Sequence, residues 1–144
     1  MKQTSGCHTR GFTIIELMIV LGVLAVLVAL AYPSYIDYVR KARRGEAQQL
    51  LMNWAINQEI WRSNNPTYAG TGDLPVPTND YFVFTLPAVS DTAFTLQAAA
   101  QGDQVNDHAK DGTSCATLQM NSVGQKYSGG DTANGACWKG SGRS

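Results

Sequence analysis

The chain begins with a polar stretch and continues into a long apolar run. Beyond this run, polar and apolar residues are interspersed. Residues 1–11 carry Lys2 and Arg10 and no acidic residue, whereas residues 17–32 read LMIVLGVLAVLVALAY without a charge. With the apolar positions at 12, 14 and 15, this segment reaches the ~20 residues that a membrane-spanning helix needs. The pattern predicts one apolar helix near the N-terminus.

A single carboxylate, Glu16, lies inside the apolar segment. An ionised side chain in hydrocarbon costs on the order of a few kcal/mol, and it usually has a partner. We therefore expect Glu16 to face a cation.

The helical pattern continues beyond the apolar run to about residue 63. Its second half is amphipathic, with the positions of one face spaced three or four apart. These positions are Ala47, Leu50, Leu51, Trp54, Gln58 and Trp61. A helix over residues 13–63 would be roughly 75 Å long. Pro33 lies inside it and predicts a kink near Tyr32, and Gly22 weakens the helix further towards its start.

The chain becomes turn-rich after residue 64, and residues 64–80 predict an irregular connection. Short strand-like runs follow, with turns at 90–91 and 123–124. The predicted strands cover residues 81–86, 93–98, 114–121 and 125–127. Their close spacing indicates an antiparallel meander, whose apolar face would cover Leu51, Trp54 and Trp61.

A secretory signal peptide is one alternative explanation of the N-terminus. It would use the basic leader, the apolar run and a cleavage-like triplet, Ala29-Leu30-Ala31. Against it, Glu16 interrupts the start of the apolar run, and the helical pattern continues past Ala31. These features favour an apolar helix that is retained.

The segment from Gly11 to Ala47 reads GFTIIELMIVLGVLAVLVALAYPSYIDYVRKARRGEA and resembles the N-terminal region of type IV pilins. In that family GFTxxE marks the prepilin-peptidase site. The resemblance implies cleavage between Gly11 and Phe12, N-methylation of the new Phe12 amine, and retention of the helix as the filament core. The continuation YPSYxDYVRKxRRxEA, from Tyr32, resembles the minor pilins of the PilE kind in type IVa systems.

The resemblance implies an α+β fold, in which a long N-terminal helix packs on a C-terminal antiparallel sheet of about four strands. Residues 1–11 would be a removed leader, residues 12–35 the transmembrane and filament-core helix, and residues 36–144 the globular head. In this family the helix loosens in filaments between a glycine and the proline, here Gly22 and Pro33. The family more often has this glycine about three positions later, where this chain has Ala25.

The resemblance also implies partners and a location. The peptidase acts first, and Glu16 then neutralises the Phe12 amine of an adjacent subunit among other major and minor pilins. The precursor would cross the inner membrane once with its head in the periplasm, and the mature subunit would enter an extracellular pilus.

A basic cluster follows the apolar run and conflicts with this topology. It consists of Arg40, Lys41, Arg43 and Arg44. The positive-inside rule would place this side in the cytoplasm, but leader processing and a cysteine pair in the head, Cys115 and Cys137, favour the opposite orientation. We expect the cluster to fan around the helix and to meet acidic neighbours such as Asp37 and Glu46.

Composition and cysteine count agree with an exported subunit. The chain has 11 basic and 11 acidic residues, and loss of Lys2 and Arg10 leaves an excess of acidic residues that suggests no polyanion partner. Cleavage removes Cys7 and leaves Cys115 and Cys137, which we expect to form a disulfide in an oxidising compartment. Such a bond contributes roughly 3 kcal/mol.

No catalytic set, cofactor motif or metal site is predicted. Asp103, Asp107 and Asp111 have a calcium-like spacing but lack the remaining ligands of a calcium loop. Lys126 and Lys139 are weak candidates for DNA contacts, as in pilins that act as uptake receptors. Trp138 is expected to pack against the head, with an exposed contact role as the alternative.

The sequence therefore predicts a structural subunit, a minor type IV pilin that contributes to pilus assembly, twitching motility and adhesion. Two alternatives remain open, a DNA-uptake receptor pilin and a type II secretion pseudopilin.

Overall fold

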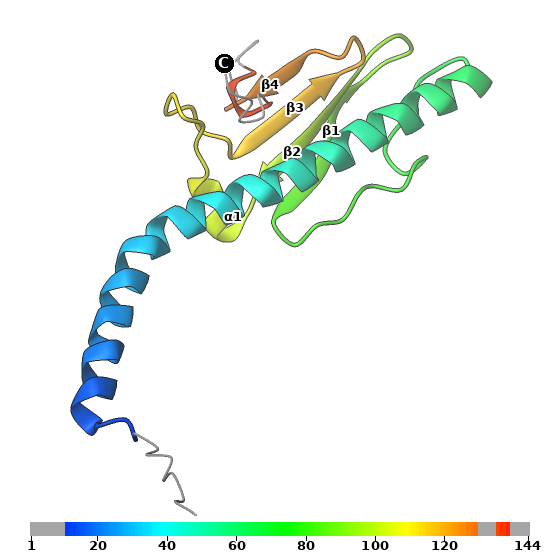
Figure 1. The fold of residues 1–144 in the computed structure, drawn as a ribbon. Coiled ribbons are helices and arrows are strands. Elements are labelled where there is room, and N and C mark those ends of the chain that lie inside the picture. Colours follow the sequence, from blue (N-terminus) through cyan, green and yellow to red (C-terminus); the bar gives the residue numbers. More distant parts are fainter. Residues whose placement is uncertain (1–10, 130–134, 139–144) are drawn as a thin grey trace, which may run out of the picture. The chain divides into compact units, whose positions relative to one another are not determined.

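The structure is a computed structural model, and it describes residues 11–129 and 135–138. The chain divides into two compact units after Ile36. The long helix α1 (Ile14–Asn64) extends through both, and Figure 1 shows it followed by the strands of the head. The predicted helix over residues 13–63 is confirmed. Gly22 and Pro33 both lie within α1.

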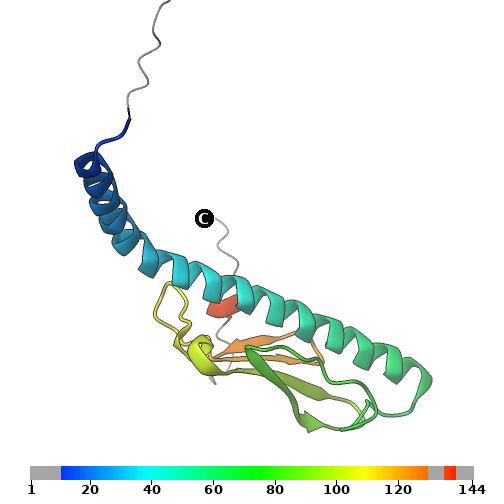
Figure 2. The same cartoon turned by 90° about the horizontal axis from the view of Figure 1, so that it is seen from below.

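Four strands form one antiparallel sheet in the order β1-β2-β3-β4. Their bounds are Phe82–Val89 for β1, Phe94–Ala100 for β2, Thr117–Asn121 for β3 and Lys126–Ser128 for β4. Sequence order and spatial order coincide, so the sheet is the predicted meander. In Figure 2 the second half of α1 lies across one face of this sheet.

The strand β1 is longer than the sequence predicts because it continues through Pro87. The pairing with β2 shifts register between Thr85 and Ala88, at the position where proline lacks the N–H that a regular ladder requires. Because β1 lies at the edge of the sheet, this irregularity is tolerated.

The strand β3 begins later than residue 114, where the prediction placed it. Ser114 forms an isolated bridge with His108, and the Cys115 amide donates to the Asp107 carbonyl at 2.8 Å. These contacts hold Ser114 and Cys115 on the preceding connection, which contains a short 3-10 helix, η1 (Gly102–Asn106). The predicted turn at 123–124 is present, and Gly124 takes a left-handed conformation there, with φ 77°.

The core of the head lies between α1 and the sheet. Leu51 and Trp54 of α1 are buried as predicted, whereas Trp61 is only half-buried. The buried apolar residues that form this cluster are Ala47, Leu51, Trp54, Phe82, Phe84, Phe94, Leu96, Ala98, Cys115, Leu118 and Cys137.

The predicted disulfide between Cys115 and Cys137 is present and fully within the core. It attaches a short 3-10 helix, η2 (Ala136–Trp138), to the connection just before β3. The Gln48 side-chain amide donates to the Cys137 carbonyl at 2.8 Å, so η2 is also held by α1.

Candidate functional site

The N-terminus of α1 is defined by a hydroxyl cap. Thr13 precedes the first helical residue, and its Oγ1 accepts a hydrogen bond from the Glu16 amide at 3.3 Å. A threonine followed three positions later by glutamate is the sequence pattern of a capping box. The helix therefore begins with residues that lie after the predicted cleavage point, and Glu16 sits in its first turn, where the helix dipole favours a negative charge.

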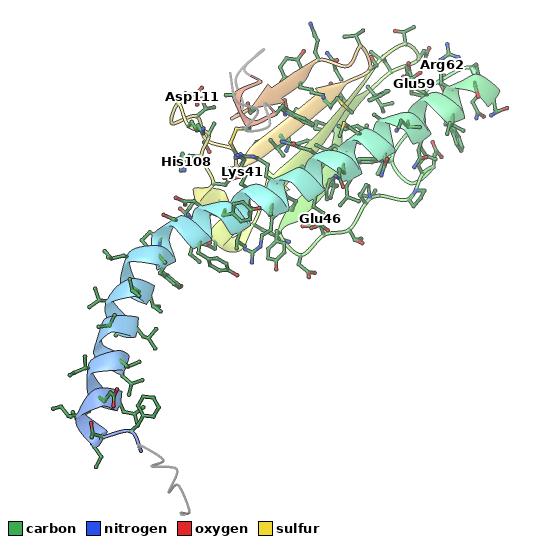
Figure 3. All side chains as sticks on the ribbon, viewed as in Figure 1. Lys41, Glu46, Glu59, Arg62, His108 and Asp111 are labelled. Carbon is green, nitrogen blue, oxygen red and sulfur yellow. A yellow bond between two sulfur atoms is a disulfide. The ribbon has the colours of Figure 1, made fainter. Side chains whose placement is uncertain are left out.

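The first half of α1 is apolar on all sides and uncovered. Figure 3 shows its side chains projecting around the helix, and the large apolar residues from Phe12 to Leu30 are each at least 47% exposed. Among the described residues, α1 is the one helix that is long and apolar enough to cross a membrane. Such a surface requires hydrocarbon or other apolar helices around it.

The predicted processing residues lie at this end of the chain. Gly11 and Phe12 are exposed and precede the helix, and Phe12 is 79% exposed. Cleavage after Gly11, methylation of Phe12, pairing of Glu16, the kink at Pro33 and the loosening from Gly22 stay predictions.

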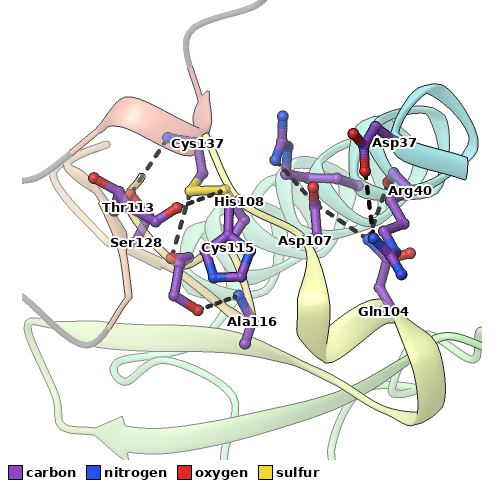
Figure 4. Close-up of polar contacts among 12 residues, drawn as sticks. Asp37, Arg40, Gln104, Asp107, His108, Thr113, Cys115, Ala116, Ser128 and Cys137 are labelled. Atoms are coloured by element: carbon purple, nitrogen blue, oxygen red, sulfur yellow. Dashed lines mark hydrogen bonds and ion pairs between the residues drawn. A yellow bond between two sulfur atoms is a disulfide. The ribbon is translucent and has the colours of Figure 1, made fainter. Parts of the chain in front are cut away.

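Two of the four residues of the basic cluster, Arg40 and Arg44, form ion pairs with the connection between β2 and β3. Arg40 binds Asp103 in a bidentate manner, with Nε–Oδ2 and Nη2–Oδ1 distances of 3.0 and 2.8 Å, and it also contacts Asp37 at 3.3 Å. One turn further, Arg44 Nη1 lies 2.9 Å from Asp107 Oδ2, and both side chains are buried. Figure 4 shows the contact between Arg40 and Asp37, with Asp107 beside them.

Of the two acidic neighbours predicted for this cluster, Asp37 is confirmed. The main partners, Asp103 and Asp107, could not be found from helical spacing because they lie 63 positions away along the chain. Gln104 completes the network, since its Nε2 donates to the Arg40 carbonyl at 3.0 Å and to Asp107 Oδ2 at 3.2 Å.

These contacts shift the acid–base equilibria of the two aspartates in opposite directions. Hydrogen bonds from Arg40 hold the pKa of Asp103 below its ordinary value. Burial raises the pKa of Asp107, and the Arg44 guanidinium opposes that rise. Asp103 and Asp107, two of the three aspartates with calcium-like spacing, form ion pairs with Arg40 and Arg44. The described residues contain no group of three or more metal-ligating side chains.

The weak candidates for DNA contacts fall near the C-terminus. Lys126 is exposed on β4, with its Nζ 5.1 Å from the centre of the Trp138 ring. Trp138 packs against the core, and its Nε1 donates to the Tyr127 carbonyl at 2.8 Å, as expected for a packed residue. Lys139 lies outside the described residues.

Family models match most of the chain. The model described as "Type IV minor pilin ComP, DNA uptake sequence receptor" matches residues 33–119. The prokaryotic N-terminal methylation motif matches residues 7–32.

Two curated relatives match in sequence. The type IV major pilin protein PilE1 of Neisseria gonorrhoeae is 32% identical over 108 residues, which is 70% of this chain and 48% of the relative. The prepilin peptidase-dependent protein D of Escherichia coli is 33% identical over 78 residues, 51% of this chain and 53% of the relative. The chain thus spans about half the length of the curated relatives it matches.

Two solved structures share the fold. A type IV pilin from Shewanella oneidensis has a TM-score of 0.52 and 24% identity, covering 70% of this chain and 99% of that one. The non-core minor pilin PilV of Neisseria meningitidis has a TM-score of 0.52 and 22% identity, covering 69% and 97%. At these identities they show the fold alone. The long apolar helix, the four-stranded sheet and the family match over residues 33–119 together show that the chain belongs to the type IV pilins, in the family of the type IV minor pilin ComP.

Proposed function

We propose that this chain is a minor pilin, a structural subunit of a type IV pilus. The observation that carries the proposal is an apolar helical segment with no cover of its own, at the start of a chain whose head is folded and closed by a disulfide. A subunit of this form is held by lipid before assembly and by neighbouring helices afterwards.

Assembly then consists of moving the apolar helix from the bilayer into a bundle of similar helices. Apolar side chains stay out of water throughout, so their burial supplies most of the cohesion. Glu16 gains the Phe12 amine of an adjacent subunit as its cation. Because an unpaired charge in an apolar bundle is costly, this contact fixes the axial register of the subunits.

The amine exists only after processing. Prepilin peptidase cuts between Gly11 and Phe12 at the cytoplasmic face of the inner membrane, and Phe12 is methylated. After cleavage, the Thr13 hydroxyl still caps the N-terminus of α1. The head lies in the periplasm until the subunit enters the extracellular filament, which serves twitching motility and adhesion.

Mass spectrometry of the mature protein tests this proposal. A methylated Phe12 at the N-terminus is expected, together with loss of residues 1–11. A mature chain that begins at Tyr32 would instead identify an ordinary signal peptide and would contradict the proposal.

A second function, DNA uptake, is favoured by the description of the matching family as a DNA uptake sequence receptor. Lys126 beside the Trp138 ring offers a cation next to an aromatic surface. The charge balance of the head is less favourable for binding DNA. Lys2, Arg10 and Glu16 are the charged residues before position 37, so the head holds nine basic and ten acidic residues. A phosphate-binding surface would therefore have to be local.

Gel shifts with the mature chain in a non-ionic detergent test DNA binding at physiological salt. If Lys126 contacts a phosphate, Lys126→Ala should weaken binding and lower the salt slope by about one. Lys110→Ala, at another exposed lysine, is the matched control. Absence of any complex with duplex DNA would rule this function out.

A further inference from the structure

Two tyrosines mark the end of the apolar segment of α1. Tyr32 and Tyr35 directly follow the aliphatic run that ends at Ala31, and each is 63% exposed. They are three residues apart, so their side chains lie on the same side of the helix. Neither hydroxyl has a hydrogen-bond partner among the residues that the structure describes.

Two tyrosines of the head, by contrast, are engaged within the protein. The Tyr68 hydroxyl donates to Glu59 Oε1 at 3.0 Å, and the Tyr127 hydroxyl donates to Gln125 Oε1 at 2.7 Å. A tyrosine ring is apolar while its hydroxyl needs a polar partner, and tyrosine is therefore enriched where a membrane meets water. An exposed tyrosine at the end of an uncovered apolar helix fits such a boundary.

The helical rise sets the distance from this boundary to the other end of the apolar segment. From Tyr32 back to Ile14, the first helical residue, α1 rises about 27 Å. A tilt of about 20°, the average for membrane helices, shortens this distance by only about 2 Å. The hydrocarbon layer of a bilayer is about 30 Å thick. With Tyr32 at one boundary, the Gly11–Phe12 bond lies close to the other, and Glu16 lies about one turn inside it.

We propose that Tyr32 and Tyr35 contact phospholipid headgroups at the periplasmic boundary of the inner membrane and hold the precursor at the depth where the Gly11–Phe12 bond meets the cytoplasmic boundary. This inference rests on the proposed function, because it requires a precursor that is cleaved there. The tyrosines act against Glu16, whose carboxylate leaves the hydrocarbon when the helix moves towards the cytoplasm. They are positioning residues that set the depth of the bond without contacting it.

Nitroxide depth measurements on the full precursor test this position. In a Cys7→Ser background with the disulfide intact, Val28→Cys and Leu17→Cys each provide one labelling site, near opposite ends of the apolar segment. Both side chains are more than half exposed. The precursor is placed in vesicles of palmitoyl-oleoyl phosphatidylethanolamine and phosphatidylglycerol, and oxygen and a nickel chelate serve as collision partners.

Tyr32→Leu/Tyr35→Leu lengthens the apolar segment by about one turn and removes its anchors. The helix should then slide towards the cytoplasm by about 5 Å, which moves the Val28 label deeper and the Leu17 label closer to the surface. Tilting alone would deepen the Val28 label and leave the Leu17 label almost unchanged, so the two responses can be told apart.

Two further variants serve as controls. Tyr32→Trp/Tyr35→Trp should keep the wild-type depth, since tryptophan has the same preference for the boundary. Tyr38→Leu is the matched control, because Tyr38 is also exposed, at 73%, but lies one further turn from the apolar segment. Its labels should stay at the wild-type depth.

Cleavage gives a second readout. In the same vesicles, prepilin peptidase should cut Tyr32→Leu/Tyr35→Leu at least about tenfold more slowly than the wild type, because a displaced bond is poorly placed for attack. In a non-ionic detergent no bilayer fixes the depth, so both proteins should be cut at equal rates. This comparison separates depth from direct contact between the tyrosines and the peptidase.

An unchanged Leu17 label in Tyr32→Leu/Tyr35→Leu would overturn the proposal, and so would an equal displacement in Tyr38→Leu. A difference in cleavage rate that persists in detergent would assign the tyrosines to a contact with the peptidase and overturn it as well. A wild-type precursor that is never cut after Gly11 would instead contradict the proposed function, and the label depths would still report on the tyrosines.

Discussion

Arg44 Nη1 lies 2.9 Å from Asp107 Oδ2, and both side chains are buried between α1 and the connection from β2 to β3. Arg44 is on a helix face that also buries Ala47 and Leu51, so the ion pair continues the core towards the start of the head. A buried pair of this kind contributes little net stability by itself, but either charge is costly when left alone.

We therefore expect Arg44→Met to destabilise the head strongly, because Asp107 would remain buried without its cation. Removal of one partner from a buried pair costs about 3–5 kcal/mol. Urea denaturation of the full chain in a non-ionic detergent, followed by tryptophan fluorescence, measures the change in the free energy of unfolding.

Lys41→Met is the matched control for this substitution, since Lys41 is also on α1 and lies at its less buried surface. Its effect should remain within about 0.5 kcal/mol. In Arg44→Met/Asp107→Leu both charges are gone, and much of the lost stability should return. An Arg44→Met protein as stable as the wild type would contradict the ion pair.

The pH dependence of stability should reflect Asp103 and Asp107 differently. The lowered pKa of Asp103 gives stability that is present above its ordinary pKa of 3.8 and is lost as the pH falls through the folded-state pKa. The raised pKa of Asp107 has the opposite effect on the pH dependence. The stability that Asp107 contributes is present below its ordinary pKa of 3.8 and is lost as the pH rises through its folded-state pKa.

Asp103→Asn should therefore be less stable than the wild type at neutral pH, and the difference should shrink as the pH falls below about 4. Thermal unfolding followed by circular dichroism between neutral and acidic pH measures this difference. Asp91→Asn, in the turn after β1, is the control. A difference for Asp103→Asn that is independent of pH would show that the Arg40–Asp103 contact does not control the titration.

The helix and sheet could be predicted because their signals are local. The uncharged run and the three-to-four spacing specify α1, and short apolar runs between turn residues specify the strands. Pro87 shows the limit of these signals, because only the edge position of β1 permits a strand to continue through it.

The charge network could not be predicted because its partners are distant in sequence. Helical spacing relates Arg40 to Asp37, but only the folded connection brings Asp103 and Asp107 to α1. Sequence likewise gives no sign that Gln104 is fully buried. At the N-terminus, by contrast, the motif from Gly11 to Glu16 can be recognised in the sequence alone. The partner proposed for Glu16 belongs to another subunit.

Removal of the disulfide should weaken the attachment of η2. In Cys115→Ala/Cys137→Ala, the loss of the crosslink should lower the free energy of unfolding by roughly 3 kcal/mol. The Gln48 contact with the Cys137 carbonyl would remain as the main polar link between η2 and α1. Urea denaturation of the wild type with and without reductant provides the control. Equal midpoints with and without reductant would show that the crosslink is not stabilising.

Gln58→Leu should loosen the connection that follows α1, because two backbone groups of Ala69 lose their partners inside the protein. An unsatisfied buried group costs about 1–3 kcal/mol. Hydrogen exchange at the Ala69 amide should accelerate, while Asn57→Leu, an exposed neighbour on α1, should leave that amide unchanged. An Ala69 amide that exchanges at the same rate in both variants would remove the proposed role of Gln58.

Glu16 offers the sharpest test of the assembly proposal, because an assembly defect in a Glu16 variant has two explanations that can be separated. One is loss of the charge, and the other is loss of the helix cap, since the Glu16 amide donates a hydrogen bond to Thr13 Oγ1. Glu16→Gln keeps the size of the side chain and removes its charge, whereas Thr13→Ala removes the cap and keeps the charge.

If Glu16 pairs with the Phe12 amine of a neighbouring subunit, Glu16→Gln should be cleaved after Gly11 and should keep a folded head, but it should fail to enter filaments. Loss of one partner of a desolvated pair costs about 3–5 kcal/mol, so incorporation should fall at least about a hundredfold. Thr13→Ala, which loses only about 1 kcal/mol of helix stability, should still assemble. Immunoblots of sheared filaments and of membranes measure both pools. Normal incorporation of Glu16→Gln, or equal defects in the two variants, would show that the charge of Glu16 does not direct assembly.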